Sequence, residues 1–262
     1  MEMSIETHFN DLEKQLDVNS TKLEKWSSNY FITHKKRYLE DIKLINKYFN
    51  TGQLLELGSA PYHLTFLMKR TNMNVIGVDI SPERFQKFIT YNDLNIIKCD
   101  IEKDKLPFQD NEFDCIIFNE IFEHLRINPI ETLLEINRVL KIDGILILTT
   151  PNLYSIRNVI NFVLGKGFDN PYKEFQKINE IGHMGHVREY SSNQVQEFLK
   201  NTGFKSIHKK MKSHQPLTGM WRIFNIVREI LPQFHSYQIQ IAKKNYTLLS
   251  DIEQNSIVNK SK

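Results

Sequence analysis

The segment QLLELGSAPY, residues 53–62, decides the fold predicted for this chain. It is a short apolar run that ends in a turn with a single glycine, Gly58. The segment VIGVDIS, residues 75–81, follows the same plan and carries an acid, Asp79, at its end. Apolar runs without alternation are typical of strands that are covered on both faces of a parallel sheet, and stretches with helical spacing separate them here. The sequence therefore predicts an α/β fold.

Further apolar runs predict the remaining strands of the sheet. We expect seven strands in all, at residues 53–57, 75–79, 95–99, 114–118, 145–149, 205–209 and 237–242. Two helices between them have marked starts, a capping residue followed by a proline, at Ser81-Pro82 and at Asn128-Pro129. The prediction is a doubly wound, mostly parallel seven-stranded sheet flanked by helices, with N-terminal helices and a loop insertion beside the active site.

The chain divides into three regions by composition. Residues 1–50 are polar, with apolar residues at helical spacing over 38–49, and we expect an N-terminal helical cap there. Residues 51–244 form the predicted main domain, in which 165–190 are a long glycine-containing loop on the side of a substrate. Residues 245–262 are polar, which predicts a flexible C-terminal tail.

Composition excludes several classes of protein. Of 262 residues, 40% are hydrophobic and 25% are charged, which is ordinary for a globular chain, and the net charge of +3 is too small to indicate nucleic acid. The two cysteines, Cys99 and Cys115, are too few for a disulfide framework and suit a reducing compartment. No apolar stretch reaches about 18 residues, and MEMSIETHFN at the start has no apolar segment of a secretory signal. We therefore expect a cytoplasmic protein.

Polar residues follow the predicted strands at the edge where ligands bind in a doubly wound sheet. Gly58 precedes Asp79 by 21 positions, close to the spacing at which an acid meets a nucleotide ribose. A dinucleotide would also need a second and a third glycine to approach its pyrophosphate, and here Ala60, Pro61 and Tyr62 occupy that turn. A cofactor with a ribose and no phosphates fits this loop better, and S-adenosylmethionine is the candidate.

These motifs resemble those of the class I S-adenosylmethionine-dependent methyltransferases of the small-molecule type. Residues 56–62 are similar to the family's first motif, acid-x-Gly-x-Gly-x-Gly, of which only the first glycine is kept. Residues 75–81 are similar to its second motif. Residues 99–108, 113–125 and 138–152 look like the third, fourth and fifth motifs of the family. The resemblance is close over about residues 53–152, and five motifs in order are a specific signal. It implies a Rossmann-like methyltransferase fold and methyl transfer from S-adenosylmethionine.

The resemblance also implies which residues contact the cofactor. We expect Asp79 to bind the ribose hydroxyls, Asp100 to face the adenine amine, and Glu56 to bind a backbone amide or the amino group of the cofactor. Asn119 follows the fourth strand near the expected position of the methyl group. The full set of predicted cofactor contacts is Glu56, Gly58, Ser59, Ala60, Asp79, Ile80, Asp100, Ile101 and Asn119.

Other polar residues are candidates for the methyl acceptor. His124 and His186 are predicted as bases that take a proton from an oxygen acceptor, because imidazole titrates near neutral pH; His124 could instead bond to a backbone carbonyl. Arg188 and Tyr190 either recognise the acceptor or anchor their loop. We expect Tyr62 to turn outward and line the acceptor pocket, the alternative being that it fills the cofactor site.

A metal site is not expected from the sequence. His183 and His186, flanked by Glu180 and Glu189, could in principle hold an ion. Glycines interrupt any helix there, and the chain has no cysteine pair at metal-binding spacing.

The predicted function is methyl transfer to a small-molecule or glycan-type acceptor, with oxygen favoured as the acceptor atom over nitrogen or carbon. Residues 119–122 read NEIF and lack the Asn/Asp-Pro-Pro-aromatic motif of methyltransferases that modify nucleic-acid amines, so no nucleic acid is expected as partner. The apolar helix over 221–231 either packs on the sheet or contacts a membrane surface or a lipid-linked acceptor. Two alternatives stay open, a non-catalytic binding or scaffold protein and an NAD(P)-dependent oxidoreductase, although the loop at Gly58 fits the latter poorly.

Overall fold

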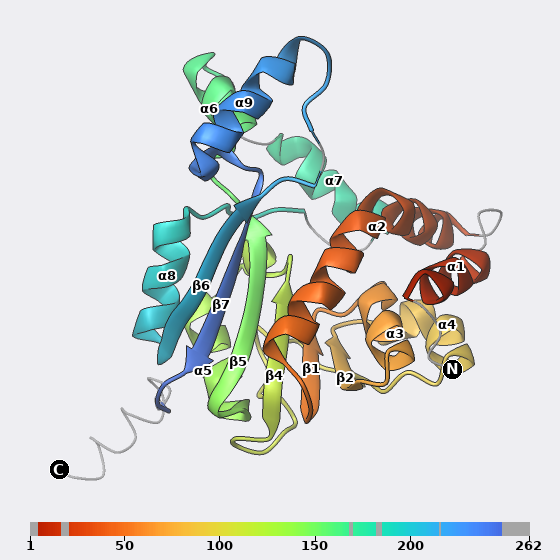
Figure 1. Ribbon diagram of the computed structural model, residues 1–262. Coiled ribbons are helices and arrows are strands. Elements are labelled where there is room, and N and C mark those ends of the chain that lie inside the picture. Colours follow the sequence, from red (N-terminus) through yellow and green to blue (C-terminus); the bar gives the residue numbers. More distant parts are fainter. Residues whose placement is uncertain (1–4, 17–20, 168–169, 182–184, 215, 248–262) are drawn as a thin grey trace.

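The computed structural model describes residues 5–16, 21–167, 170–181, 185–214 and 216–247. Its centre is one seven-stranded sheet with the order β3-β2-β1-β4-β5-β7-β6 (Figure 1). The strands are β1 (Gln53–Leu57), β2 (Asn74–Asp79), β3 (Ile96–Lys98), β4 (Phe113–Asn119), β5 (Leu140–Pro151), β6 (Phe204–Lys212) and β7 (Tyr237–Lys244). All seven expected strands are present.

The direction of the strands matches the predicted fold class. Strands β1 to β5 are parallel to one another, and β7 lies antiparallel between β5 and β6. The order reverses between β1 and β4, which pair directly, with Leu55 opposite Ile116. The prediction of a doubly wound, mostly parallel seven-stranded sheet is confirmed, and ligands of such sheets bind beyond the carboxyl ends of the strands at this reversal.

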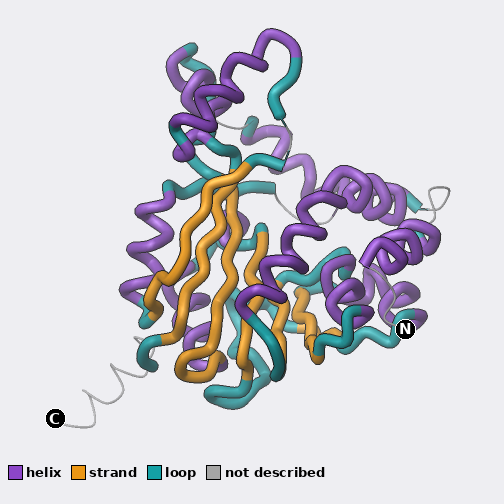
Figure 2. Tube along the Cα trace, in the orientation of Figure 1, coloured by secondary structure: helices purple, strands orange, loops and turns teal. Residues whose placement is uncertain are grey.

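Helices cover both faces of the sheet (Figure 2). Neighbouring residues of β1 point to opposite sides, so Leu54 belongs to a core shared with the N-terminal helices and Leu55 to a second core shared with the helices that follow β4. This two-sided burial explains why the strands are apolar throughout. The helices are α1 (Ile5–Gln15), α2 (Lys22–Tyr48), α3 (His63–Arg70), α4 (Gln86–Tyr91), α5 (Pro129–Val139), α6 (Ile156–Val163), α7 (Pro171–Ile181), α8 (Ser192–Asn201) and α9 (Ile223–Ile230).

Only one of the two predicted helix starts has the expected cap. Asn128 accepts a hydrogen bond from the amide of Ile130, and Pro129 opens α5. Ser81 makes no such side-chain bond, and a 3-10 turn, Pro82–Phe85, precedes α4. The amide of Ser81 donates instead to Asp79. The expected cap at Ser81 is therefore wrong, because the end of β2 engages this residue through its backbone.

Two regions differ from their expected form. The segment 165–190 is not loop throughout, because α7 spans part of it. The helix expected over 221–231 is present as a 3-10 turn, Gly219–Arg222, followed by α9, but it does not pack on the sheet. It lies with α6 beyond the carboxyl end of β5 (Figure 1), and Ile223, Ile226 and Ile230 are 63–71% exposed. Of the predicted C-terminal tail, residues 248–262 lie outside the described residues.

In the described part of the chain, none of the helices combines the length and the apolar character that a bilayer crossing requires.

Candidate cofactor and acceptor site

A cavity of about 60 Å³ lies at the carboxyl edge of β1 and β4, where the strand order reverses. Helix α2 closes it from one side and contributes Arg37 and Asp41 to its wall. The turn after β1 contributes Gly58, and the end of β4 contributes Asn119 and Glu120. The cavity therefore joins residues of the N-terminal region to the two strand ends that the sequence predicts as the ligand edge.

The turn after β1 is held against the end of β2. Gly58 has φ of +67°, and a Cβ at this position would lie 2.2 Å from the side chain of Ile121, so glycine alone fits. The amide of Ala60 donates to one oxygen of Asp79 at 3.2 Å, and the amide of Ser81 donates to the other at 2.9 Å. These bonds fix the carboxylate of Asp79, which is 8% exposed, at the edge beside the turn. Ile80, the next residue, is 48% exposed.

Ser59 has a structural part in the same turn. Its amide donates to the carbonyl oxygen of Val78 at 3.0 Å, and its hydroxyl donates to that oxygen at 3.2 Å. The side chain is buried, and a Cβ at Gly77 would lie 2.8 Å from its hydroxyl oxygen. Gly77 thus allows the turn after β1 to lie close to β2, because a side chain at this position would approach Ser59 too closely.

The side chain of Tyr62 points into the core, so the prediction that it turns outward to the acceptor is wrong. The residue is fully buried, and its ring packs edge-to-face on Phe85 with centroids 5.7 Å apart. Burial, followed by the nearby charge of Asp79, raises the pKa of Tyr62. A ring of this size gains more from the apolar contacts between the sheet and α3 than from a place in the cavity wall.

Three polar side chains meet at the cavity with few partners. Glu56 is buried and accepts a hydrogen bond from the hydroxyl of Thr65, and burial raises its pKa to about 8. Burial likewise raises the pKa of Asp41 to about 7, although the charge of Arg37 opposes this. The amide nitrogen and oxygen of Asn119 are both buried without a hydrogen-bond partner among the described residues. Because unpaired buried polar groups are costly, this set fits a ligand that carries both donors and acceptors.

Asp100 lies at the same edge with its own ion pair. The Lys103 ammonium lies 2.8 Å from its carboxylate, and the amide of Glu102 donates to it at 3.1 Å. Burial opposes ionisation, but these two contacts lower the pKa of Asp100. The backbone of Cys99 donates to the carbonyl of Asp79, so Asp79 and Asp100 occupy neighbouring strand ends. Ile101 follows, half-buried.

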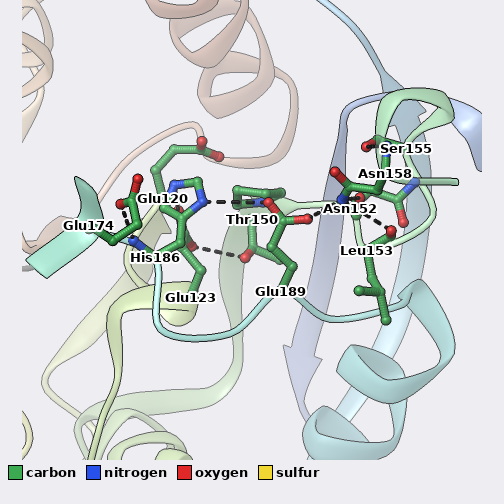
Figure 3. Close-up of polar contacts among 12 residues, drawn as sticks. Glu120, Glu123, Thr150, Asn152, Leu153, Ser155, Asn158, Glu174, His186 and Glu189 are labelled. Carbon is green, nitrogen blue, oxygen red and sulfur yellow. Dashed lines mark hydrogen bonds and ion pairs between the residues drawn. The ribbon is translucent and has the colours of Figure 1, made fainter. Parts of the chain in front are cut away.

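The two predicted histidines come together on the other side of the β4 end. Their ring centroids are 5.3 Å apart, His124 on a 3-10 turn, Phe122–His124, and His186 on the segment after α7. The Nδ1 atom of His124 lies 2.9 Å from the carbonyl oxygen of Gly185. The amide of His186 donates to Glu174 of α7 at 3.1 Å (Figure 3). Tertiary structure thus joins two residues that are far apart in the sequence.

Glu123 belongs to this group and was not predicted. It is 1% exposed, and one of its oxygens accepts a hydrogen bond from the hydroxyl of Thr150 at 2.9 Å (Figure 3). Its other oxygen lies 3.8 Å from Nε2 of His124 and 4.0 Å from Nε2 of His186. Burial, and then the charge of Glu120, raise the pKa of Glu123 to about 8. The spacing of Glu120 and Glu123, one helical turn apart and next to His124, was the signal that could have found it.

Tyr190 packs as an anchor of its loop, which is one of the two roles that the sequence left open for it. It is 3% exposed, and its ring packs on Phe122 and Phe198 with centroids 4.7 and 5.6 Å away. The exposed guanidinium of Arg188 lies 5.2 Å from the centre of the Tyr190 ring. Burial of an aromatic ring in the second core decides the position of this segment.

The raised pKa values of Glu56 and Asp41 predict a pH dependence of stability. Both groups hold their proton more tightly in the folded chain than in the unfolded chain, whose carboxyl pKa values lie near 4. The contribution of these two groups to the free energy of unfolding should therefore fall as the pH rises from about 5 to 8, by at most about 1.4 kcal/mol per pH unit for each group. Because buried histidines such as His63 contribute with the opposite sign, the wild type is compared with a variant by urea titration across this range. The Glu56→Gln variant should lack the part of the fall that Glu56 contributes, and an equal slope in both proteins would contradict the assignment.

Comparison with known proteins agrees with this geometry. Residues 55–148 match the family described as methyltransferase domain. The uncharacterized protein MJ1252 of Methanocaldococcus jannaschii is 28% identical over 235 residues, which are 84% of this chain and 88% of that protein.

Solved structures share the fold at low identity. An S-adenosylmethionine-dependent methyltransferase from Archaeoglobus fulgidus has a TM-score of 0.58 and 18% identity over 82% of this chain and 99% of its own. The cyclase SpnF has a TM-score of 0.51 and 17% identity over 77% of this chain and 80% of its own. Residues 55–148 thus match the methyltransferase domain family, and the chain has the fold of S-adenosylmethionine-dependent methyltransferases.

Proposed function

We propose that this chain transfers a methyl group from S-adenosylmethionine to an oxygen atom of a small-molecule or glycan-type acceptor. The observation that carries the proposal is the unpartnered, buried amide of Asn119 at the reversal of strand order, with carboxyls on one side and two histidines on the other. The family and fold imply S-adenosylmethionine as the cofactor. When bound, it supplies a methyl group on a positively charged sulfur.

The residues at the edge fit the parts of this cofactor. Asp79 would accept the ribose hydroxyls, and Asp100 would face the adenine. Glu56 and Asn119 would bind the amino-acid end, because one offers a buried carboxyl and the other an unpaired amide. Helix α2 covers this end of the site and contributes Arg37 and Asp41 to its wall. Positioning of donor and acceptor in such a pocket supplies much of the rate of a displacement reaction.

The histidine side of the site supports an oxygen acceptor. A hydroxyl loses its proton as it attacks a methyl group, and a nearby base assists that loss. His124 and His186 lie together just beyond Glu120, which lines the cavity and pairs with Arg37 at 3.5 Å. An acceptor that enters between the residues that line the cavity and the pair of histidines would therefore meet basic side chains.

One further observation favours an acceptor carried on a lipid. Helices α6 and α9 expose large apolar side chains next to each other in the part of the molecule beyond β5, among them Phe162, Val163 and Ile226. Arg157 of α6 and Arg222 at the start of α9 are exposed in the same part of the molecule. Exposed apolar side chains next to exposed cationic ones are typical of proteins that lie on a membrane surface. We propose this face as a contact with lipid.

The first experiment tests the cofactor. A thermal-shift titration with S-adenosylhomocysteine should raise the melting temperature of the wild-type chain by several degrees at about 100 times the Kd. NAD and NADP should give no shift. The Asp79→Ala variant should bind at least about tenfold more weakly, because the ribose loses a charged partner. Asp93→Ala, which removes an exposed acid outside the site, is the matched control. Equal affinity in the two variants would exclude Asp79 as the ribose ligand, and a shift with NAD alone would favour an oxidoreductase.

The second experiment tests the acceptor atom. Methyl transfer from labelled S-adenosylmethionine is measured with a panel of phenols, sugars and amines. Hydroxyl acceptors should be methylated, and His186→Ala should slow that reaction at least about tenfold because general-base assistance is worth this much or more. His208→Ala, on β6 away from the site, serves as control. Methylation of amines alone would rule out the proposed oxygen chemistry, and cofactor binding without any transfer would favour a binding protein.

The third experiment tests the lipid contact. The wild-type chain should sediment with vesicles that contain anionic lipid, since apolar burial and cationic groups act together. The variant Ile223→Ser/Ile226→Ser/Ile230→Ser should lose most of this binding and keep its response to S-adenosylhomocysteine. Substitution of the exposed Ile142 by Ser, on the far side of the sheet from this face, should change neither property. No sedimentation of the wild type, or unchanged sedimentation of the triple variant, would contradict the proposal.

A further inference from the structure

Glu123, His124 and His186 form a compact group of metal-ligating side chains. Each offers one ligand atom, and these three atoms lie within 4.8 Å of one another. The three residues come from two segments: the turn after β4 carries two of them, and the segment after α7 carries the third. Both segments are held by further contacts, so the arrangement belongs to the fold.

One carboxylate oxygen of Glu123 is aimed at the two imidazoles. This oxygen is buried and has no hydrogen-bond partner among the described residues, whereas the other oxygen is bonded to Thr150. It lies 3.8 Å from Nε2 of His124 and 4.0 Å from Nε2 of His186, which is too far for a hydrogen bond. A buried carboxylate oxygen left in this way is costly unless a charge faces it.

The surroundings of both imidazoles orient their Nε2 atoms as ligands. A carbonyl oxygen can only accept, so Nδ1 of His124 carries the hydrogen that it donates to Gly185, and its Nε2 is left with the lone pair. Nδ1 of His186 faces the carboxylate of Glu189 at 3.5 Å. The other oxygen of Glu189 accepts from the amide of Asn158 at 2.6 Å (Figure 3). Histidines that bind metals have such an oxygen on the opposite ring nitrogen almost without exception.

We propose that Glu123, His124 and His186 bind a divalent cation of the zinc type. Two imidazoles and one carboxylate with a position left open are a donor set that suits this class of ion. A cation about 2.1 Å from each ligand atom brings the atoms to about 3.5 Å from one another, so a small inward shift of the side chains completes the site. The cation would place a positive charge against the oxygen of Glu123 that has no hydrogen-bond partner among the described residues.

This proposal replaces the expectation of no metal. That expectation rested on the neighbouring residues His183 and His186, of which His183 lies outside the described residues. The pair that the fold brings together is His124 and His186, 62 positions apart. Such a pair has no spacing that a sequence motif could reveal.

The open position gives the cation a use in the proposed reaction. Glu120 lies between the cluster and the cavity, since its charge acts on Glu123 and its side chain lines the cavity. With the cation bound, the Nε2 lone pairs of the two histidines hold the metal and do not take a proton, so the cation would hold the acceptor oxygen and favour its ionised form in their place. This use rests on the proposed function, whereas binding of the cation does not.

The test is a zinc titration of the chelator-stripped full chain, in competition with a chromophoric chelator. The wild type should bind one equivalent of Zn²⁺. Glu123→Gln and His186→Ala should each weaken zinc binding at least about tenfold. Loss of a residue that merely hydrogen-bonds to a metal ligand already lowers metal affinity by about this factor. His208→Ala should bind as the wild type does. Binding that is no tighter in the wild type than in His186→Ala would overturn the proposal, as would absence of a stoichiometric site.

Cofactor binding is measured on the same samples to separate the two proposals. If Glu123→Gln keeps its thermal shift with S-adenosylhomocysteine and loses zinc, the metal site is confirmed in a folded chain. If the wild type responds to S-adenosylhomocysteine and does not bind zinc, the metal site is refuted and the proposed function stands. Zinc binding without a response to the nucleoside refutes the function and supports the site. Should Glu123→Gln fail to fold, His186→Ala decides, because its side chain is 33% exposed and its removal leaves the core intact.

Discussion

The site depends on two hydrogen bonds to the carboxylate of Asp79. The amides of Ala60 and Ser81 donate to its two oxygens, and so the turn after β1 is tied to the end of β2. Gly58 permits the turn, because its positive φ and its contact with Ile121 leave no room for a side chain. Burial of the carboxylate strengthens bonds that would be weak in water. The turn after β1 and the end of β2 therefore form one fixed edge of the candidate site.

Helix α2 supplies the other wall of the site through buried polar contacts. The hydroxyl of Ser27 lies 2.9 Å from Nε2 of His63, and the hydroxyl of Tyr38 lies 3.3 Å from its Nδ1. Burial lowers the pKa of His63 to about 3, so these contacts join neutral groups and need no counter-charge. Apolar residues of α2 enter the same core as β1 and β5. With the helix fixed in this way, Arg37 and Asp41 face the cavity.

Prediction from the sequence succeeded where a residue's place follows from its own strand. The edge positions of Asp79, Asp100 and Asn119 follow from the apolar runs before them, because parallel strands end at one edge. It failed for the orientation of Tyr62, which was expected to turn outward and is buried against Phe85. It left two roles open for Tyr190, which packs against Phe122 and Phe198 in the second core. It also left two placements open for α9, because an apolar helix face alone does not reveal whether a sheet covers it.

The sequence by itself determined the doubly wound sheet and the edge at which Gly58 and Asp79 meet. Both follow from local periodicity and from short spacings, which one strand-helix-strand unit converts into proximity. Only the tertiary structure decided how the histidine side of the site is assembled. Glu123, His124 and His186 meet because the turn after β4 and the segment after α7 are packed together by contacts with Thr150, Gly185 and Glu174. Such contacts join residues at separations that no local pattern encodes, since they depend on how the whole chain buries its apolar surface.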